Sequence, residues 1–161
     1  MKENAPLPLY EGKVQDQWID EFGHMNMSRY VEACDYATYA FWELVNAPNN
    51  LEAREGAEYA VVEAHLNYMS ELRKGDPIRV TTQLLAADSK RFQLFHCLYN
   101  AGTEELVASN EIMALGFNLK TRSLMSFHPH VLARIEDILA KHADLPQPKN
   151  AGRAIGLRRK G

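Results

Sequence analysis

Apolar side chains recur along this chain at two spacings, and the spacing separates the predicted helices from the predicted strands. Between residues 28 and 45 they fall every three or four positions, which predicts an amphipathic helix of about five turns. Its apolar stripe is expected at Val31, Cys34, Thr38, Phe41 and Val45. Ser28 is the expected N-cap, and the proline-containing segment 46–50 is expected to close the helix. A second helix is predicted over 128–142, with an apolar face of Val131, Leu132, Ile135, Ile138 and Leu139.

Five further segments have the features of β-strands. The segment 12–20 alternates weakly and predicts a short first strand, whereas 58–72 predicts an unusually long one. In that long strand one face is expected to carry Ala60, Val62, Ala64, Leu66 and Tyr68, and the other Glu63, His65 and Asn67. Turns at 75–77 and 101–103 delimit three more strands, within 78–88, 90–100 and 105–119.

The predicted order is strand, long helix, four strands and a terminal helix, which indicates an α+β fold in a single domain over 1–161. The apolar stripe of the long helix must be covered. A curved antiparallel β-sheet wrapped around a central helix is the simplest cover, and this arrangement is the hotdog fold. The C-terminal helix is expected to pack beside it.

Composition excludes several classes of protein. The chain is 46% hydrophobic and 24% charged, and its net charge of −3 gives no basic field for nucleic acid. The N-terminus lacks the apolar core of a signal peptide, and no apolar run is long enough to span a membrane, so we expect a cytoplasmic protein. Cys34 and Cys97 are widely separated and are expected to be reduced, packed thiols. The basic C-terminal segment 152–161 is either a solvated end or a contact for phosphates of a small ligand.

A polar cluster, residues 18–30 with the sequence WIDEFGHMNMSRY, directly precedes the long helix. The first N–H groups of a helix lack intrahelical partners and carry partial positive charge, which suits an oxygen that gains negative charge. Asp20 lies just before this end, and Gly23 permits a close approach of backbone and ligand. A carboxylate in that position can activate water or attack a carbonyl. The alternative is structural, with Asp20 as a cap, Gly23 as a turn residue and His24 on the surface.

The cluster resembles the first-strand signature of hotdog-fold acyl-CoA thioesterases of the 4-hydroxybenzoyl-CoA thioesterase type. The matching residues are Asp20, Gly23 three positions on, and Tyr30 in the helix. The run GHMN is similar to a form found in one branch of that family. The segment 61–96 resembles most closely the betainyl-CoA thioesterases, which act in carnitine breakdown. The likeness extends from about residue 14 to residue 156.

The resemblance implies roles for particular residues. Asp20 would be the nucleophile or general base, and the backbone N–H of Met27 would polarise the thioester carbonyl. The family often has asparagine where this chain has Arg29, and Asn26 is then the candidate for a helper polar group. No metal or redox cofactor is implied, because coenzyme A enters only as part of the substrate. Relatives of this type pair through their sheets, so a homodimer or tetramer with active sites between subunits is expected.

Three other groups of residues are candidates for the site. Glu63 either faces solvent with His65 or lines a pocket. Lys90 and Arg91 are either solvated turn residues or contacts for the phosphates of coenzyme A. The two histidines of the HPH run at 128–130 favour helix initiation around the proline over a metal site.

The sequence therefore predicts an enzyme that hydrolyses a small acyl-CoA, with betainyl-CoA as the first candidate. Aromatic rings hold quaternary ammonium groups well, and Trp18 is the first ring expected to contact such an acyl group. One alternative is a thioesterase for another short-chain, aromatic or medium-chain acyl-CoA. Another is a hotdog domain that binds acyl-CoA without hydrolysing it.

Overall fold

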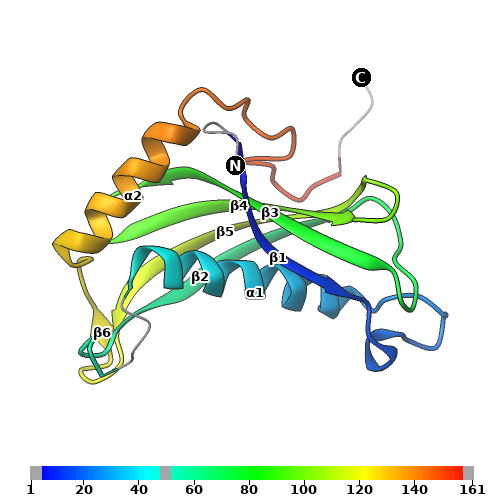
Figure 1. Cartoon of the computed structure of the whole chain (residues 1–161), viewed down its shortest axis with the longest axis horizontal. Coiled ribbons are helices and arrows are strands. Elements are labelled where there is room, and N and C mark those ends of the chain that lie inside the picture. The colour runs from blue at the N-terminus through cyan, green and yellow to red at the C-terminus, as the bar shows by residue number, and fades with distance from the viewer. Residues whose placement is uncertain (1–4, 48–51, 158–161) are drawn as a thin grey trace.

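The computed structural model describes residues 5–47 and 52–157, and in this part of the chain one curved antiparallel sheet wraps around a long helix, α1 (Figure 1). The strand order is β1-β3-β4-β5-β2, with β6 paired to β5. The strands are β1 (Leu7–Lys13), β2 (Ala57–Tyr68), β3 (Pro77–Ala87), β4 (Arg91–Asn100), β5 (Glu105–Asn118) and β6 (Ser123–Leu124). The helices are α1 (Met27–Val45) and α2 (Pro129–His142). The predicted α+β hotdog arrangement is confirmed, and the two-residue β6 was not expected.

The first strand lies earlier in the chain than predicted. It spans Leu7–Lys13, whereas Asp16–Trp18 forms one turn of 3-10 helix, so the prediction of a strand over 12–20 is wrong beyond its first two residues. β1 contains Pro8, which cannot donate a ladder hydrogen bond. It is tolerated because β1 is an edge strand that pairs only with β3, and the register shifts beside the proline.

Helix α1 crosses the concave face of the sheet. Its small residues Ala33 and Ala37 are fully buried and allow the helix to approach the strands closely. The predicted stripe is correct at four of its five positions, but Val31 is 39% exposed. The buried face instead follows Tyr30, Ala33, Cys34, Ala37, Thr38, Phe41, Trp42 and Val45. The helix ends at Val45, and its C-cap is Asn46, whose side-chain amide donates to the Ala57 carbonyl at 2.9 Å. The proline predicted to stop the helix, Pro48, lies outside the described residues.

The long second strand contains a bulge between Val61 and Glu63 that shifts its register against β5. A bulge moves the following side chains to the other face of a strand. Beyond it Leu66 packs into the core, and the outward Glu63 and His65 border one cleft. The predicted alternation is therefore correct after the bulge, but Val62 lies within the irregular stretch, and the expected continuous face is wrong there.

The core consists of two apolar clusters, one at each end of α1, and a polar group between them. The cluster near the helix start includes Trp18 and Leu98, and the one near its end includes Trp42 and Phe92. Between them His96 is fully buried, with Thr38 Oγ1 2.9 Å from its Nε2 and Thr82 Oγ1 2.9 Å from its Nδ1. Burial lowers the pKa of His96 to about 3, so this ring is neutral in the folded protein.

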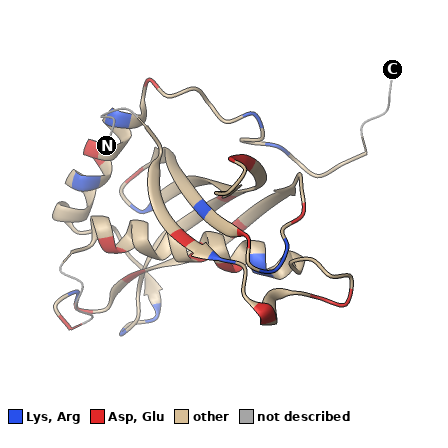
Figure 2. Ribbon diagram, turned by 45° about the vertical axis from the view of Figure 1, so that its right-hand side comes forward, with Lys and Arg blue, Asp and Glu red and all other residues tan. Residues whose placement is uncertain are grey.

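Helix α2 packs beside the end of α1 through the predicted apolar face, and the tail then extends across the molecule (Figure 1). The backbone N–H of Gly152 donates to Glu111 at 2.7 Å, and Arg153 donates to Asn67 at 3.2 Å. The three basic residues at 158–160 lie outside the described residues. Acidic and basic residues are interspersed along the ribbon in the view of Figure 2. In the described ranges, neither helix has the length and apolar character required to cross a bilayer.

Candidate active site

A tight loop holds Asp20 immediately ahead of α1. Ile19 and Met25 pair in an isolated antiparallel bridge, which brings the two ends of the loop together. Within it the N–H of Asp20 donates to the His24 carbonyl at 3.1 Å, and the N–H of Gly23 donates to the Asp20 carbonyl at 3.1 Å. Gly23 has a φ of 85°, a conformation that side chains other than glycine rarely adopt. The polar cluster of the sequence is therefore a closed loop that fixes the carboxylate.

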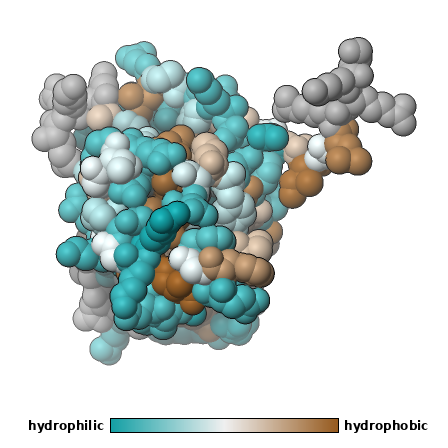
Figure 3. Space-filling view, turned by 90° about the vertical axis from the view of Figure 1, so that its right-hand side faces the viewer, coloured by the Kyte–Doolittle hydropathy of each residue, from teal (hydrophilic) through white to brown (hydrophobic). Residues whose placement is uncertain are grey.

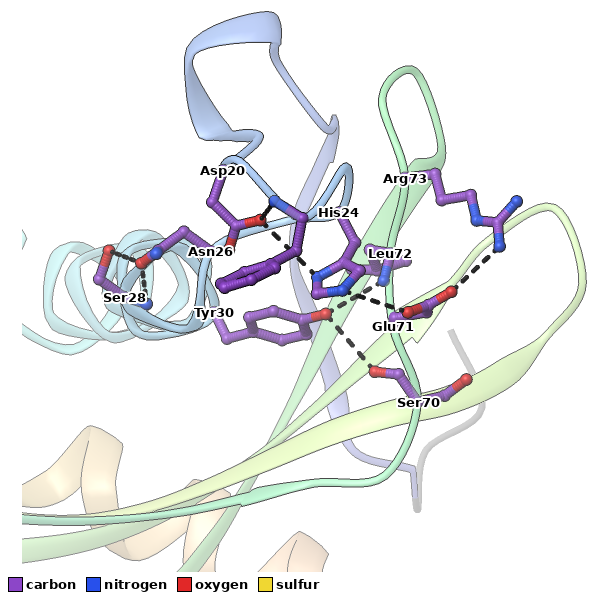
Figure 4. A network of polar contacts seen from close by, with 10 residues as sticks. Asp20, His24, Asn26, Ser28, Tyr30, Ser70, Glu71, Leu72 and Arg73 are labelled. Atoms are coloured by element: carbon purple, nitrogen blue, oxygen red, sulfur yellow. Dashed lines mark hydrogen bonds and ion pairs between the residues drawn. The ribbon is translucent and has the colours of Figure 1, made fainter.

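The Asp20 side chain is partly open to solvent, with 18% of it exposed. Its Oδ1 accepts a hydrogen bond from the N–H of Phe22 at 2.9 Å and lies 4.0 Å from Nδ1 of His24 (Figure 4). Nε2 of the same histidine lies 3.6 Å from Glu71. Among residues 5–47 and 52–157, Oδ2 of Asp20 has no hydrogen-bond partner. One carboxylate oxygen is thus anchored, and the other is available for chemistry.

The N-terminus of α1 begins beside this carboxylate. Asn26 is the N-cap, and its Oδ1 accepts from the backbone N–H of Ser28 at 3.0 Å and from its hydroxyl at 2.8 Å. The prediction of Ser28 as the cap is therefore wrong by two residues. In the described part of the chain the N–H of Met27 has no acceptor, because the capping oxygen binds the next amide along. A free amide at a helix start can donate to an oxygen that gains negative charge.

Tyr30 ties this loop and helix to the segment between β2 and β3. Its ring is 3% exposed, and its hydroxyl accepts from the N–H of Leu72 at 3.0 Å and donates to the Ser70 carbonyl at 3.4 Å. The N–H of Met25 donates to the Leu72 carbonyl at 2.7 Å. Burial raises the pKa of Tyr30 above its ordinary value, which keeps the hydroxyl protonated. Tyr30 thus positions the site, and no proton transfer is assigned to it.

Apolar side chains are exposed around the same end of α1. Phe22 is 75% exposed, Met27 65%, Tyr68 44% and Met69 45%. Figure 3 looks onto this end of the molecule and shows apolar atoms exposed within an otherwise hydrophilic surface. The hydroxyl of Tyr68 donates to the Met27 carbonyl at 3.2 Å. The sequence predicted neither Tyr68 nor Glu71 as a site residue, because their contacts with Met27 and His24 join segments more than 40 residues apart.

Trp18, the ring first expected to contact an acyl group, is 2% exposed and belongs to the core. That expectation is wrong, because a buried ring has no face to offer a ligand. The 3-10 turn that contains Trp18 directs the ring inward beneath the loop.

Glu63 lies away from Asp20 within one chain. It is exposed and lines a cleft of about 350 Å³ on the outer face of the sheet, together with His65 and Arg153. Helix α1 lies on the concave face, so the sheet separates this glutamate from the carboxylate of its own chain. Both alternatives for Glu63 hold in part, because the side chain is exposed and also borders this cleft, and its position within one chain assigns it no catalytic role.

Lys90 and Arg91 lie beyond the far end of β3 from the site. β3 has 11 residues, which corresponds to about 33 Å of strand between these cations and the segment that contacts Tyr30. Arg91 is paired with Asp88 at 2.6 Å, and both cations border a cleft of about 220 Å³. One chain therefore does not bring Lys90 or Arg91 to Asp20.

The HPH run begins α2, as predicted, with His128 as the N-cap and Pro129 in the first turn. In the described ranges no three histidine, cysteine, aspartate or glutamate side chains gather as metal ligands. A cavity of about 610 Å³ between residues 5–8 and α2 is likewise remote from the site, since it borders the end of α1 at Leu44.

Comparisons with known proteins agree with this geometry. Residues 14–135 match the family model of the thioesterase-like superfamily. Betainyl-CoA thioesterase of Pseudomonas aeruginosa is 34% identical over 151 residues, which cover 94% of this chain and 95% of that protein. An L-carnitine dehydrogenase/betainyl-CoA thioesterase of a Rhizobium species is 32% identical over 154 residues, covering 96% of this chain and 31% of that longer protein. A candidate thioesterase of known structure from Pseudomonas putida is 28% identical and superposes with a TM-score of 0.81, covering 96% of this chain and 99% of that one.

Proposed function

The chain belongs to the thioesterase-like superfamily, and we propose that it hydrolyses the thioester of a small acyl-CoA to the free acid and CoA. The observation that carries this proposal is the Asp20 carboxylate on a closed loop that leads directly into α1, where the N–H of Met27 has no acceptor among the described residues. A reacting carbonyl needs both an oxyanion donor and a group that delivers the nucleophile, and this loop supplies the two together.

In the proposed mechanism the thioester oxygen accepts a hydrogen bond from Met27 N–H, and the α1 dipole stabilises its developing charge. Asn26 holds that amide in place through its capping bond to Ser28. Oδ2 of Asp20 then either removes a proton from water that attacks the carbonyl carbon, or attacks that carbon itself. In both routes the C–S bond breaks and CoA leaves as a thiolate. In the second route, water hydrolyses the acyl-aspartate anhydride.

Betainyl-CoA is the proposed substrate, which would place the enzyme in carnitine metabolism. The two similar proteins named above carry this activity in their names, one of them along nearly its whole length. The charge of the site supports a cationic acyl group, because Asp20 and Glu71 both flank His24, in the loop that precedes α1. A thioesterase for an uncharged short-chain, aromatic or medium-chain acyl-CoA is the alternative within the same chemistry. Neither reaction requires a metal or redox cofactor, since water and CoA are the only other participants.

We also propose that the protein associates as a homodimer or tetramer through β2. This strand is 12 residues long and lies at the edge of the sheet, where its outer backbone groups face no other strand of the described residues. Val61 and Val62 on it are 42% and 53% exposed. A long, apolar, uncovered edge favours pairing with another strand. Light scattering should give at least twice the 18.3 kDa of one chain, and a monomeric mass would contradict the proposal.

Association through β2 would also give Lys90 and Arg91 a route to CoA phosphates, because a second subunit can bring distant residues to a shared site. Other cations on the site side of the same chain are Arg29, paired with Glu32, Arg73, paired with Glu71 at 3.1 Å, and Lys74, paired with Asp16 at 2.7 Å. Exposed pairs of this kind exchange partners readily, so either cation can also meet a phosphate. The cytoplasmic location expected from the sequence stays a prediction.

A panel of acyl-CoA substrates tests the function directly, with release of free thiol as the readout. The panel contains betainyl-CoA, acetyl-CoA, butyryl-CoA, benzoyl-CoA and octanoyl-CoA. The proposal predicts multiple-turnover hydrolysis with the highest kcat/KM for betainyl-CoA. A higher kcat/KM for an uncharged acyl group would overturn the betaine assignment, and binding of every substrate without thiol release would favour a non-catalytic acyl-CoA-binding domain.

A further inference from the structure

Tyr68 presents a fixed and accessible ring beside the helix start. Its hydroxyl donates to the Met27 carbonyl at 3.2 Å, and its ring meets the ring of Tyr30 edge-on, with centroids 5.2 Å apart and planes at 86°. Tyr30 is itself held by Leu72 and Ser70. Tyr68, the last residue of β2, is nevertheless 44% exposed within one chain. The neighbours therefore fix the ring while part of its surface remains free to meet a ligand.

The ring is attached to the residue whose N–H would bind the acyl carbonyl. A single methylene separates the carbonyl carbon of a betainyl group from its quaternary nitrogen. If the carbonyl oxygen accepts from Met27 N–H, that nitrogen lies about 5 Å from the amide, by ordinary bond lengths and hydrogen-bond distances. Tyr68 is anchored to the other backbone group of the same residue. A cation within about 6 Å of a ring centroid gains from the interaction with its face.

The other rings near the loop are less suited to this contact. Trp18 and Tyr30 are 2% and 3% exposed, so neither offers a free face. Phe22 is 75% exposed but stacks on His24, with centroids 6.3 Å apart, and no side-chain contact holds it to the helix start. Tyr68 is the ring that combines exposure with attachment to Met27.

The carboxylates near Tyr30, which contacts the Tyr68 ring, also suit a cation. Asp20 lies near Nδ1 of His24, and Glu71 lies near Nε2 of the same ring. The neighbouring cations are themselves paired, Arg73 with Glu71 at 3.1 Å and Arg29, in the first turn of α1, with Glu32. A trimethylammonium group at Tyr68 would therefore meet a ring face with a carboxylate nearby, and cation–π contacts strengthen where water is excluded.

We propose that Tyr68 is a specificity-determining residue that recognises the trimethylammonium group of betainyl-CoA, an inference that rests on the proposed function. The ring attracts the positive charge, which an uncharged acyl group of the same shape lacks. The matching uncharged probe is 3,3-dimethylbutanoyl-CoA, in which carbon replaces the quaternary nitrogen. Discrimination between these two substrates isolates the charge from size and shape.

The test compares kcat/KM for both substrates in wild type, Tyr68→Leu and Tyr68→Phe. Tyr68→Leu should lower kcat/KM for betainyl-CoA by about 2- to 30-fold more than for the uncharged probe, the range that a cation–π contact supplies. Tyr68→Phe keeps the ring and should keep the preference for the charged substrate, even if loss of the bond to Met27 slows both reactions equally. Tyr36→Leu is the control for loss of an exposed ring elsewhere on α1. This ring is 43% exposed and stacks on Tyr10 with centroids 4.9 Å apart, and its loss should leave the preference between the two substrates unchanged.

Each outcome separates the inference from the function on which it rests. An equal loss for both substrates in Tyr68→Leu, with the fold retained by circular dichroism, would mean that the ring only supports the helix start and would overturn the inference. Wild-type kcat/KM for both substrates in that variant would also overturn the inference. If the wild type hydrolyses the uncharged probe but not betainyl-CoA, the betaine assignment and the inference both fail, while thioesterase activity stands.

Discussion

The buried imidazole of His96 makes the stability of this protein depend on pH. Its folded pKa is about 3, against 6.5 when unfolded. Between these values the unfolded chain binds a proton that the folded chain does not, so stability is full above pH 6.5 and falls as the pH decreases towards 3. At 1.36 kcal/mol per pH unit, the fall from pH 6.5 to pH 5 is about 2 kcal/mol. That is a large share of the 5–15 kcal/mol typical of a domain.

The perturbation that isolates this effect is His96→Gln, which retains hydrogen-bonding groups near Thr38 and Thr82 but cannot titrate. Urea unfolding at pH 7 and at pH 5 gives, for wild type and for the variant, the change in unfolding free energy between the two pH values. Contributions from other histidines, including His142, whose pKa is also lowered by burial, cancel in the comparison. Wild type should lose about 2 kcal/mol more than the variant between the two pH values. Equal losses would show that His96 is protonated or hydrated in the folded state and would refute the reasoning.

Two further predictions concern the support of the site. Tyr30→Phe should lower the unfolding free energy measured in urea by about 1–3 kcal/mol, because the buried N–H of Leu72 loses its acceptor. The same change at the half-exposed Tyr36 should lower it by under about 0.5 kcal/mol. Similar costs at both tyrosines would contradict the structural role of Tyr30. Asn26→Ala should cost about 1 kcal/mol and reduce kcat, because the cap on Ser28 is lost, and Asn26→Ser should retain most of both. An alanine variant as stable and active as the serine variant would argue against the cap.

Much of the fold could be predicted because periodicity reports directly on burial. α1 and the face of α2 follow from three- and four-residue spacing, and the later strands from alternation between turns. The first strand was misplaced because β1 contains Pro8, which is unfavourable in a strand unless the strand lies at an edge, and position in a sheet is not a local property. The bulge at Val61–Glu63 was missed for a related reason, since it is defined by the register against β5.

The sequence predicted the site residues that are neighbours along the chain, but not the contacts that distant segments make with them. Asp20, Gly23 and the helix start are within ten residues of one another, so their proximity could be inferred from the sequence. The role of Tyr30 as an anchor for Leu72 joins residues 42 apart, and the exposure of Tyr68 depends on how the end of β2 meets α1. The inward direction of Trp18 likewise results from a 3-10 turn that alternation did not indicate.

The most direct test of the catalytic claim is the rate of free thiol release by Asp20→Asn on the best substrate of the acyl-CoA panel. Asparagine keeps an acceptor for the Phe22 amide but can neither remove a proton from water nor form an acyl intermediate efficiently. We expect kcat of Asp20→Asn to fall at least about 100-fold, while its urea midpoint and its affinity for CoA stay near wild type. The control variant Glu21→Gln changes the exposed neighbouring residue and should retain activity. Hydrolysis by Asp20→Asn at close to the wild-type rate would contradict the mechanism.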